Sequence, residues 1–168
     1  KKEDLRETKS IEVGNIFSLG SRFSEALKLN FTDEAGVLRP VVMGSYGIGP
    51  GRIMGTLVEL LADEKGLVWP ETVAPFQVHL LPLFARDDKV AQVADGLYAS
   101  LLERGIEVLY DDRTIPAGEK LTDSDLFGIP YRVVVSEKTL AERSVEIRRR
   151  GTGALHLVSE RDATTAKF

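Results

Sequence analysis

The sequence predicts an α/β fold in two parts: a mixed, mainly parallel sheet flanked by helices, preceded by a partial antiparallel sheet. Pro70 and Pro75 stand five residues apart in the segment 69–75, where they interrupt both helix and sheet patterns. After this segment strand and helix patterns alternate, which is typical of parallel strands joined by helices. Before it, short strand patterns lead into a single helix. These observations predict two domains, residues 1–70 and 71–168.

The first part contains strand patterns followed by one helix pattern. We expect strands at residues 11–17, 29–32 and 40–48, and the turn residues at 33–36 predict a hairpin between the last two. A helix is expected over residues 50–64, followed by Gly66 as its terminator. Its buried stripe should consist of the apolar residues at helical spacing, Ile53, Leu57, Leu60 and Leu61. Such a sheet needs further strands to cover its edges, and so this part is expected to belong to a larger domain.

The second part should fold as a domain of its own. The predicted elements, in order, are a strand at 76–82, a helix at 87–104 capped by Asp87 and closed by Gly105, a strand at 106–110, a short helix at 120–126, a strand at 131–136 and a hairpin of 145–149 with 155–158. The polar tail at 161–168 is expected to fray.

The composition of the chain excludes several classes of protein and of site. The chain has 168 residues, of which 43% are hydrophobic and 29% charged, and no apolar run approaches the roughly 20 residues that span a bilayer. The opening residues are charged and lead to no secretory signal. The absence of cysteine excludes disulfides and thiolate zinc sites, and the two histidines are too few for a histidine metal cluster. We therefore expect a cytoplasmic protein with no metal site and no membrane partner.

A net charge of −4 argues against a surface that binds nucleic acid everywhere, but a local RNA site remains possible. The densest basic run is residues 148–150, all arginine, with Arg143 nearby. It fits either a solvated strand end or a set of phosphate contacts.

The strongest motif is GSYGIGPGR at residues 44–52, between a predicted strand and a predicted helix. Glycines let a ligand approach the backbone, and a helix N-terminus offers unpaired amides to phosphate. Arg52 adds a permanent planar cation. The motif is neither a Walker loop nor a dinucleotide fingerprint. From these residues alone, a nucleotide site and a tight structural turn are both open.

Four blocks of the sequence carry a family resemblance. The motif at 44–52 resembles motif 3 of class II aminoacyl-tRNA synthetases, and IEVGNIFSLG with RFSEA, over residues 11–26, is similar to the block before motif 3 in bacterial-type prolyl-tRNA synthetases. The segments GLVWPETVAPFQVHLLPL and GIEVLYDDRTIPAGEKLTDSDLFGIPYRVVV resemble the linker and centre of their anticodon-binding domain. The resemblance covers most of the chain, and implies the end of a catalytic domain followed by an anticodon-binding domain.

The resemblance implies an ATP site in the first part. Arg52 matches the motif 3 arginine that holds the ATP end of the adenylate and is the catalytic candidate. Gly47 and Gly49 match glycines under the ligand, and Glu12 and Asn15 occupy positions whose side chains approach ATP or its magnesium ions. All five are therefore candidate ATP-binding residues.

The same resemblance implies a proline pocket. Phe17 and Ser45 fall on its lining, and an aromatic wall beside a tight glycine strand suits a small apolar substrate. Many bacterial relatives carry histidine where this chain has Asn15, and often cysteine where it has Ser45, which puts the individual contacts in doubt.

Anticodon recognition is implied for the loop and helix after the strand at 106–110. Arg113, Lys120 and Asp123 are the candidates, because exposed anticodon bases present edges that such side chains read. In this reading Asp111 and Asp112 orient Arg113. Phe127 and His79 are interpreted as core residues, His79 with its hydrogen bonds satisfied.

The full enzyme implied would activate proline with ATP and Mg²⁺ and transfer it to tRNA(Pro). Family members are homodimers, and no cofactor intrinsic to this chain is expected. Because the first two class II motifs are absent from these residues, we expect the chain alone to be inactive in adenylate formation. Two alternatives remain, a threonyl- or histidyl-type synthetase and a non-catalytic RNA-binding module.

Overall fold

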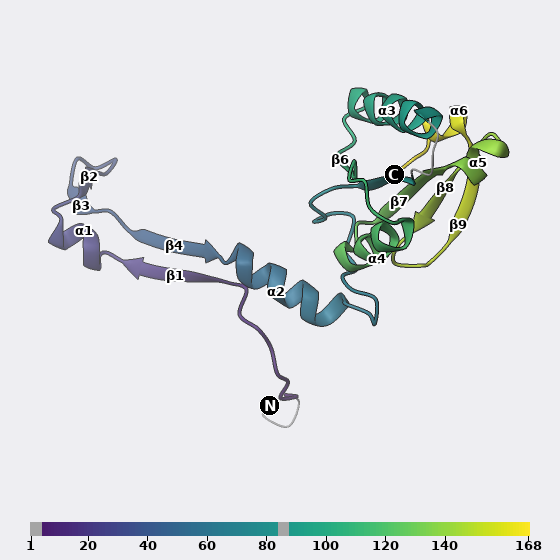
Figure 1. Ribbon diagram of the computed structural model, residues 1–168. Coiled ribbons are helices and arrows are strands. Elements are labelled where there is room, and N and C mark those ends of the chain that lie inside the picture. Colours follow the sequence, from purple (N-terminus) through teal and green to yellow (C-terminus); the bar gives the residue numbers. More distant parts are fainter. Residues whose placement is uncertain (1–4, 84–87) are drawn as a thin grey trace. The chain divides into compact units, whose positions relative to one another are not determined.

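The structure is a computed structural model that describes residues 5–83 and 88–168 (Figure 1). Within it the chain forms two compact units, Lys1–Thr56 and Leu57–Phe168. The predicted capping residue Asp87 lies outside the described residues. The segment between residue 57 and the predicted domain limit at 70 packs with the second unit. The domain limits remain a prediction, because compact packing need not follow the limits of a domain.

The first unit is built from two antiparallel pairs (Figure 1). Its elements are β1 (Gly14–Gly20), α1 (Arg22–Ala26), β2 (Asn30–Thr32), β3 (Leu38–Pro40) and β4 (Met43–Ile48). β1 pairs with β4 and β2 pairs with β3, both antiparallel. The segment 40–48, predicted as one strand, therefore belongs to two strands, β3 and β4. Only β3 pairs with β2 in the expected hairpin. The short helix α1 was not predicted.

The turn between β2 and β3 explains where that hairpin closes. The Asp33 carboxylate accepts hydrogen bonds from the amides of Ala35 and Val37, at 3.0 and 2.9 Å. Gly36 supplies a positive φ of 75°. Aspartate commonly bonds its own following backbone in this way, and the left-handed conformation suits glycine. The pattern at 33–36 thus identified the turn correctly.

Helix α2 (Pro50–Leu61) begins where predicted and ends three residues early. Asp63 then forms a tight turn with Gly66, whose φ of 142° only glycine adopts readily. The expectation of a buried stripe on this helix was wrong, since none of its residues is buried and Leu60 is 71% exposed. The helix is amphipathic by sequence, but among the described residues its apolar face is only partly covered, at Ile53 and Leu57.

The second unit holds the α/β fold. Its elements are β5 (Val78–Leu83), α3 (Asp88–Glu103), β6 (Val108–Tyr110), α4 (Ala117–Phe127), β7 (Tyr131–Ser136), α5 (Glu137–Ala141), β8 (Ser144–Arg149), β9 (Leu155–Ser159) and α6 (Glu160–Ala163). The strand order is β6-β5-β7-β8-β9. β5 pairs in parallel with β6 and β7, whereas β7, β8 and β9 pair antiparallel. The sheet is mixed as predicted, but parallel pairing is not in the majority.

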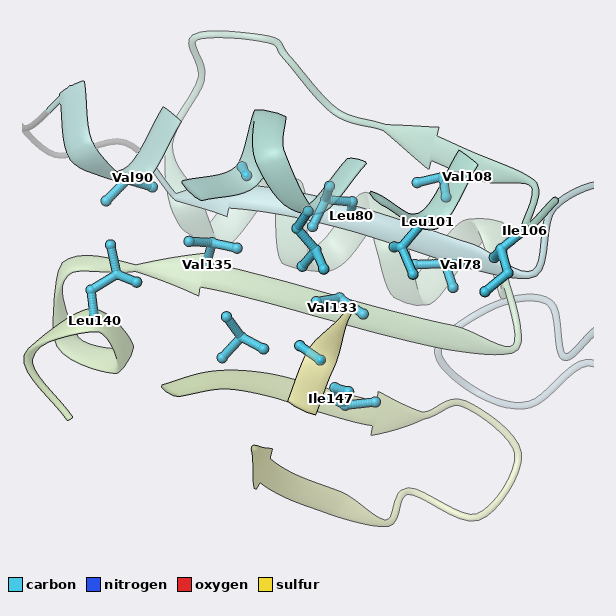
Figure 2. Packing of buried hydrophobic residues seen from close by; sticks show 14 residues of the cluster. Val78, Leu80, Val90, Leu101, Ile106, Val108, Val133, Val135, Leu140 and Ile147 are labelled. Carbon is cyan, nitrogen blue, oxygen red and sulfur yellow. The ribbon is translucent and has the colours of Figure 1, made fainter. Parts of the chain in front are cut away.

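The two faces of this sheet carry different layers. On one face, alternate residues of β5 and β7 pack against α3, and those of β8 lie beside α5 and α6 (Figure 2). The buried apolar residues of this core are Val78, Leu80, Val90, Ala94, Leu97, Leu101, Ile106, Val108, Val133, Val135, Leu140, Val145, Ile147 and Ala163. The opposite face carries His79, Leu81 and Arg132, with α4 beside them.

Two capped helices account for elements that the sequence patterns missed. Ser136 and Thr139 form a capping box that starts α5, and Ser159 accepts a hydrogen bond from the amide of Asp162 at the start of α6. Ala163 of α6 is fully buried in the core. The prediction of a frayed tail was therefore wrong, because the cap and this buried alanine anchor it.

Among the described residues, no helix is both long enough and apolar enough to cross a lipid bilayer.

Candidate functional sites

The first candidate site is one face of the β1–β4 pair. Asn15 lies directly opposite Gly47, and Phe17 lies directly opposite Ser45. Side chains alternate between the faces of a strand, so these four residues share one face. All four were predicted to line the ATP and proline sites. The register brings them together over two adjacent cross-strand pairs.

Arg52 and Glu12 lie at one end of this face. The Nη1 of Arg52, in the first turn of α2, donates to the backbone oxygen of Glu12 at 2.8 Å. The Nδ2 of Asn15 donates to the Glu12 carboxylate at 2.9 Å, and the Gly49 amide donates to the Val13 oxygen at 3.0 Å. Residues forty positions apart in the sequence are thus joined. The five predicted ATP-binding residues fall within one connected neighbourhood.

A hollow of about 650 Å³ lies against the same strand pair, mainly on the opposite face, because most of its strand residues alternate with the four described above. Its lining residues are Val13, Gly14, Asn15, Ile16, Tyr46, Gly47, Ile48 and Ile53. A side chain at Gly14 would place its first carbon 2.9 Å from the oxygen of Gly47. Glycine is therefore required at residue 14 for the two strands to approach each other.

The second candidate site begins in the loop after β6. Asp111 accepts two hydrogen bonds from the Arg113 guanidinium, at 2.9 and 2.8 Å, and Arg113 also reaches Asp123 at 2.8 Å. This pairing with Arg113 lowers the pKa of Asp111. The interpretation that Asp111 orients Arg113 is confirmed. The structure brings Arg113 and Asp123 together, but their side chains are hydrogen-bonded to each other.

Lys120 has a different role from the one predicted. Its side chain is fully buried, and its ammonium donates to the backbone oxygens of Pro82 and Asp111 at 3.0 and 2.8 Å. Burial lowers the pKa of Lys120. This geometry contradicts the prediction that Lys120 itself contacts the anticodon. The charge instead ties the ends of β5 and β6 together beneath the Arg113 loop.

A groove of about 420 Å³ lies on the sheet face that carries α4. Its lining residues are Leu83, Leu121, Arg132, Val134, Ser136, Lys138, Thr139, Glu142, Glu146, Leu155 and Leu157. Leu155 and Leu157, which lie on β9, are about half exposed. The groove therefore combines apolar surface with charged groups from β7, β8 and α5 with its C-cap, a composition that suits a flat, polar-edged ligand.

Arg132 is unusual among the groove residues because its charged side chain is buried. It is 8% exposed, and its Nη1 donates to Asp125 at 3.1 Å, while its Nε has no partner in the part of the chain described. Burial lowers the pKa of Arg132. A buried donor without a partner is costly, and such groups concentrate at functional sites. The analysis of the sequence missed Arg132, although a charged residue inside an apolar strand was the available signal.

His79 and Phe127 depart from their predicted roles. His79 is 1% exposed, so it is a core residue, but its Nδ1 has no partner in the described part of the chain. Its ring lies 5.9 Å from that of Phe127, which is itself partly exposed and not core. Burial lowers the pKa of His79 to about 4. The imidazole is therefore neutral at neutral pH.

The basic run at 148–150 is neutralised by acidic side chains. Arg148 lies 4.0 Å from Asp125, Arg149 lies 2.6 Å from Glu71, and Arg150 contacts Asp63 at 2.6 Å. Each of the three therefore faces a carboxylate within this unit. This arrangement favours the structural interpretation of the run over a set of phosphate contacts. No group of three or more histidine or acidic residues suited to a metal ion occurs within residues 5–83 and 88–168.

Comparison with known proteins identifies the family of the second unit. The family described as "Anticodon binding domain" matches residues 77–166, which is β5 through α6. The chain belongs to the anticodon-binding domain family. Arg113, Asp123 and Arg132 all lie within the matched residues.

Curated relatives match both units. The chain is 49% identical over 152 residues to "Proline--tRNA ligase" of Persephonella marina, 46% identical over 164 residues to that of Bacillus cytotoxicus, and 43% identical over 159 residues to that of Desulforamulus reducens. These alignments cover 90%, 98% and 95% of this chain but only 27%, 29% and 28% of the relatives. The chain thus spans less than a third of their length.

Proposed function

We propose that this chain is the part of a cytoplasmic proline–tRNA ligase that supplies the motif 3 portion of the ATP site and the domain that reads the tRNA(Pro) anticodon. The observation that carries the first half is the register of β1 and β4. It sets Asn15 against Gly47 and Phe17 against Ser45 on one face. The relatives named proline–tRNA ligase support the choice of amino acid.

In this proposal the first unit holds ATP and proline. Arg52 neutralises phosphate charge at the α2 N-terminus, where the helix dipole also favours an anion. Glu12, held by Asn15, supplies a carboxylate for the Mg²⁺ that accompanies ATP. Phe17 and Ser45 line the proline side. No covalent intermediate on the protein is needed, because the reaction depends on positioning and on charge neutralisation.

The second unit binds the anticodon in the groove beside α4. An unstacked base packs on the exposed Leu155 and Leu157, and the guanidinium of Arg132, which lines the groove, donates to its edge through a terminal nitrogen. Lys138 at the rim meets the backbone phosphate, and the paired Arg113 and Asp123 read a neighbouring base. Lys120 acts only as a buried support for that loop. The complete enzyme is proposed to be a homodimer.

A chimera tests the catalytic half. Residues 1–168 replace the matching segment of the Bacillus cytotoxicus protein, and pyrophosphate exchange is measured with proline, threonine and histidine. We expect exchange with proline alone, and Arg52→Lys to lower it at least tenfold because the planar fork is lost. Exchange with threonine or histidine would replace the proposal by a sister synthetase. The isolated chain should show no exchange.

An RNA titration tests the other half with the complete 168-residue chain. Fluorescence anisotropy follows a labelled RNA hairpin that carries a proline anticodon, with the loop guanines replaced by adenines as a mismatch. Loss of a hydrogen bond to a charged group costs about 1.5–3 kcal/mol, so Arg132→Met should weaken binding roughly tenfold or more. The matched control is Arg161→Met, an exposed arginine outside the groove. Equal binding of both hairpins would contradict anticodon recognition.

A further inference from the structure

The segment 62–71, which we call the strap, follows α2 and lies along the second unit. Its backbone is paired there: the Leu67 amide donates to the Leu126 oxygen at 3.0 Å, and the Trp69 amide donates to the Gly128 oxygen at 3.1 Å. A side chain at Gly128 would come within 1.9 Å of the Leu67 oxygen. The strap is therefore docked by close backbone approach, unlike a flexible tether.

Charged side chains clamp the strap at both ends. Arg150 donates through both terminal nitrogens to the two oxygens of Asp63, each at 2.6 Å. At the other end Glu71 accepts from Arg149 at 2.6 Å and from the Tyr131 hydroxyl at 3.1 Å. The paired arrangement of Arg150 and Asp63 is the strong fork geometry. The bond to Arg150 also lowers the pKa of Asp63, as expected for a carboxylate held by a guanidinium.

One residue joins the strap clamp to the groove. The Nε of Arg150 donates to the backbone oxygen of Asp125 at 3.2 Å, while the Asp125 carboxylate accepts from Arg132 at 3.1 Å inside the groove. Asp125 lies in the last turns of α4, immediately before the residues that pair with Leu67 and Trp69. A ligand that moves Arg132 therefore acts on the same helix end that holds the strap.

We propose that the strap is a positioning element for the groove, in which Arg150 links Asp63 to Asp125 so that strap docking and RNA binding at Arg132 stabilise each other. The inference rests on the proposed anticodon groove. Arg150 and Asp63 touch no RNA; they act through Asp125 and Arg132. Because coupling is reciprocal, RNA should tighten the strap by the same factor by which the docked strap tightens RNA binding.

The test measures two quantities in the complete chain: hydrogen exchange of the Leu67 and Trp69 amides, and affinity for the proline-anticodon RNA hairpin. Couplings of this kind amount to about 5–150-fold. We expect RNA to slow exchange at these amides at least fivefold. Asp63→Ala should free the amides and weaken RNA binding by a similar factor. The control is Glu64→Ala, which removes an exposed carboxylate one residue away and should change neither quantity.

Rescue separates positioning from a purely structural role. Asp63→Glu keeps the carboxylate and should therefore retain the strap protection and RNA affinity that Asp63→Ala loses. Arg150→Lys keeps the charge but loses the fork, and should lose both. Free strap amides with unchanged RNA affinity in Asp63→Ala would overturn the coupling and leave the groove intact. Protected amides in that variant would equally overturn it. Absence of RNA binding by the unaltered chain would instead remove the proposed function itself.

Discussion

The two units contrast in how they bury apolar surface. In the first unit the described residues include one fully buried side chain, Ser24, and the apolar residues Ile16, Tyr46 and Ile48 on β1 and β4 are exposed. In the second unit, residues of the sheet and of α3, α5 and α6 together form one buried apolar core. The contrast indicates that the first unit depends on further protein surface for its stability, whereas the second unit is stabilised by its own core.

The largest expected effect compares equal substitutions in and out of the core. Leu80→Ala removes a fully buried side chain from the centre of the sheet and should lower the free energy of unfolding by about 2–5 kcal/mol. Leu27→Ala, at a residue of the first unit that is 73% exposed, should change it by less than about 0.5 kcal/mol. Urea unfolding monitored by circular dichroism measures both. Similar losses of unfolding free energy for the two variants would contradict the contrast between the units.

The second effect concerns pH and His79. Burial holds the pKa of His79 at about 4 in the folded protein, below its ordinary value of 6.5. The unfolded chain therefore binds this proton more readily, and stability falls as pH drops from about 6.5 to 4, by up to roughly 3 kcal/mol for this group.

The measurement is the free energy of unfolding in urea at pH 7 and pH 5 for the unaltered chain and for His79→Leu. The Leu variant removes the titrating group, so its stability should vary less over this interval. The charges of Asp111, Arg113, Arg132 and Asp123 act on His79 from the surrounding elements. An equal pH dependence in both proteins would contradict a buried neutral imidazole.

Two glycines of similar conformation give a sharper test of strap docking. Gly128 and Gly153 have φ values of 69° and 70°, so an alanine at either is strained by about 1 kcal/mol. Only at Gly128 would the new carbon also strike the Leu67 oxygen; nothing lies within 4 Å at Gly153. Thermal unfolding should therefore show an excess cost of about 1–2 kcal/mol for Gly128→Ala. Equal losses of stability for the two variants would mean that the strap moves away from the new side chain at no cost in free energy.

The smallest effect concerns the cap that anchors the tail. Ser159→Ala removes the hydroxyl that accepts from the Asp162 amide at 3.1 Å, and should cost about 1 kcal/mol in urea unfolding. Ser100→Ala, inside α3, should be neutral or slightly stabilising because alanine is the better helix former. If Ser159→Ala were equally neutral, the tail would be held by the buried Ala163 and by Arg104, which donates to the backbone oxygens of Thr164 and Ala166, rather than by the cap.

The sequence by itself determined the order of most strands and of the longer helices, and the family, because local periodicity, turn chemistry and motif order are written in neighbouring residues. Tyr131–Ser136 was predicted with its observed bounds, and the turn at 33–36 with its position. These features depend on short-range backbone preferences.

Only the tertiary structure decided which charged side chains are available. Lys120 and Arg132 are both basic and both within the segment that resembles the family, yet the Lys120 ammonium donates to two backbone oxygens and the Arg132 Nε has no partner among the described residues. The pairing of Asp63 with Arg150 joins residues 87 positions apart. Burial and partners at such separations arise from packing of distant segments, which no local pattern encodes.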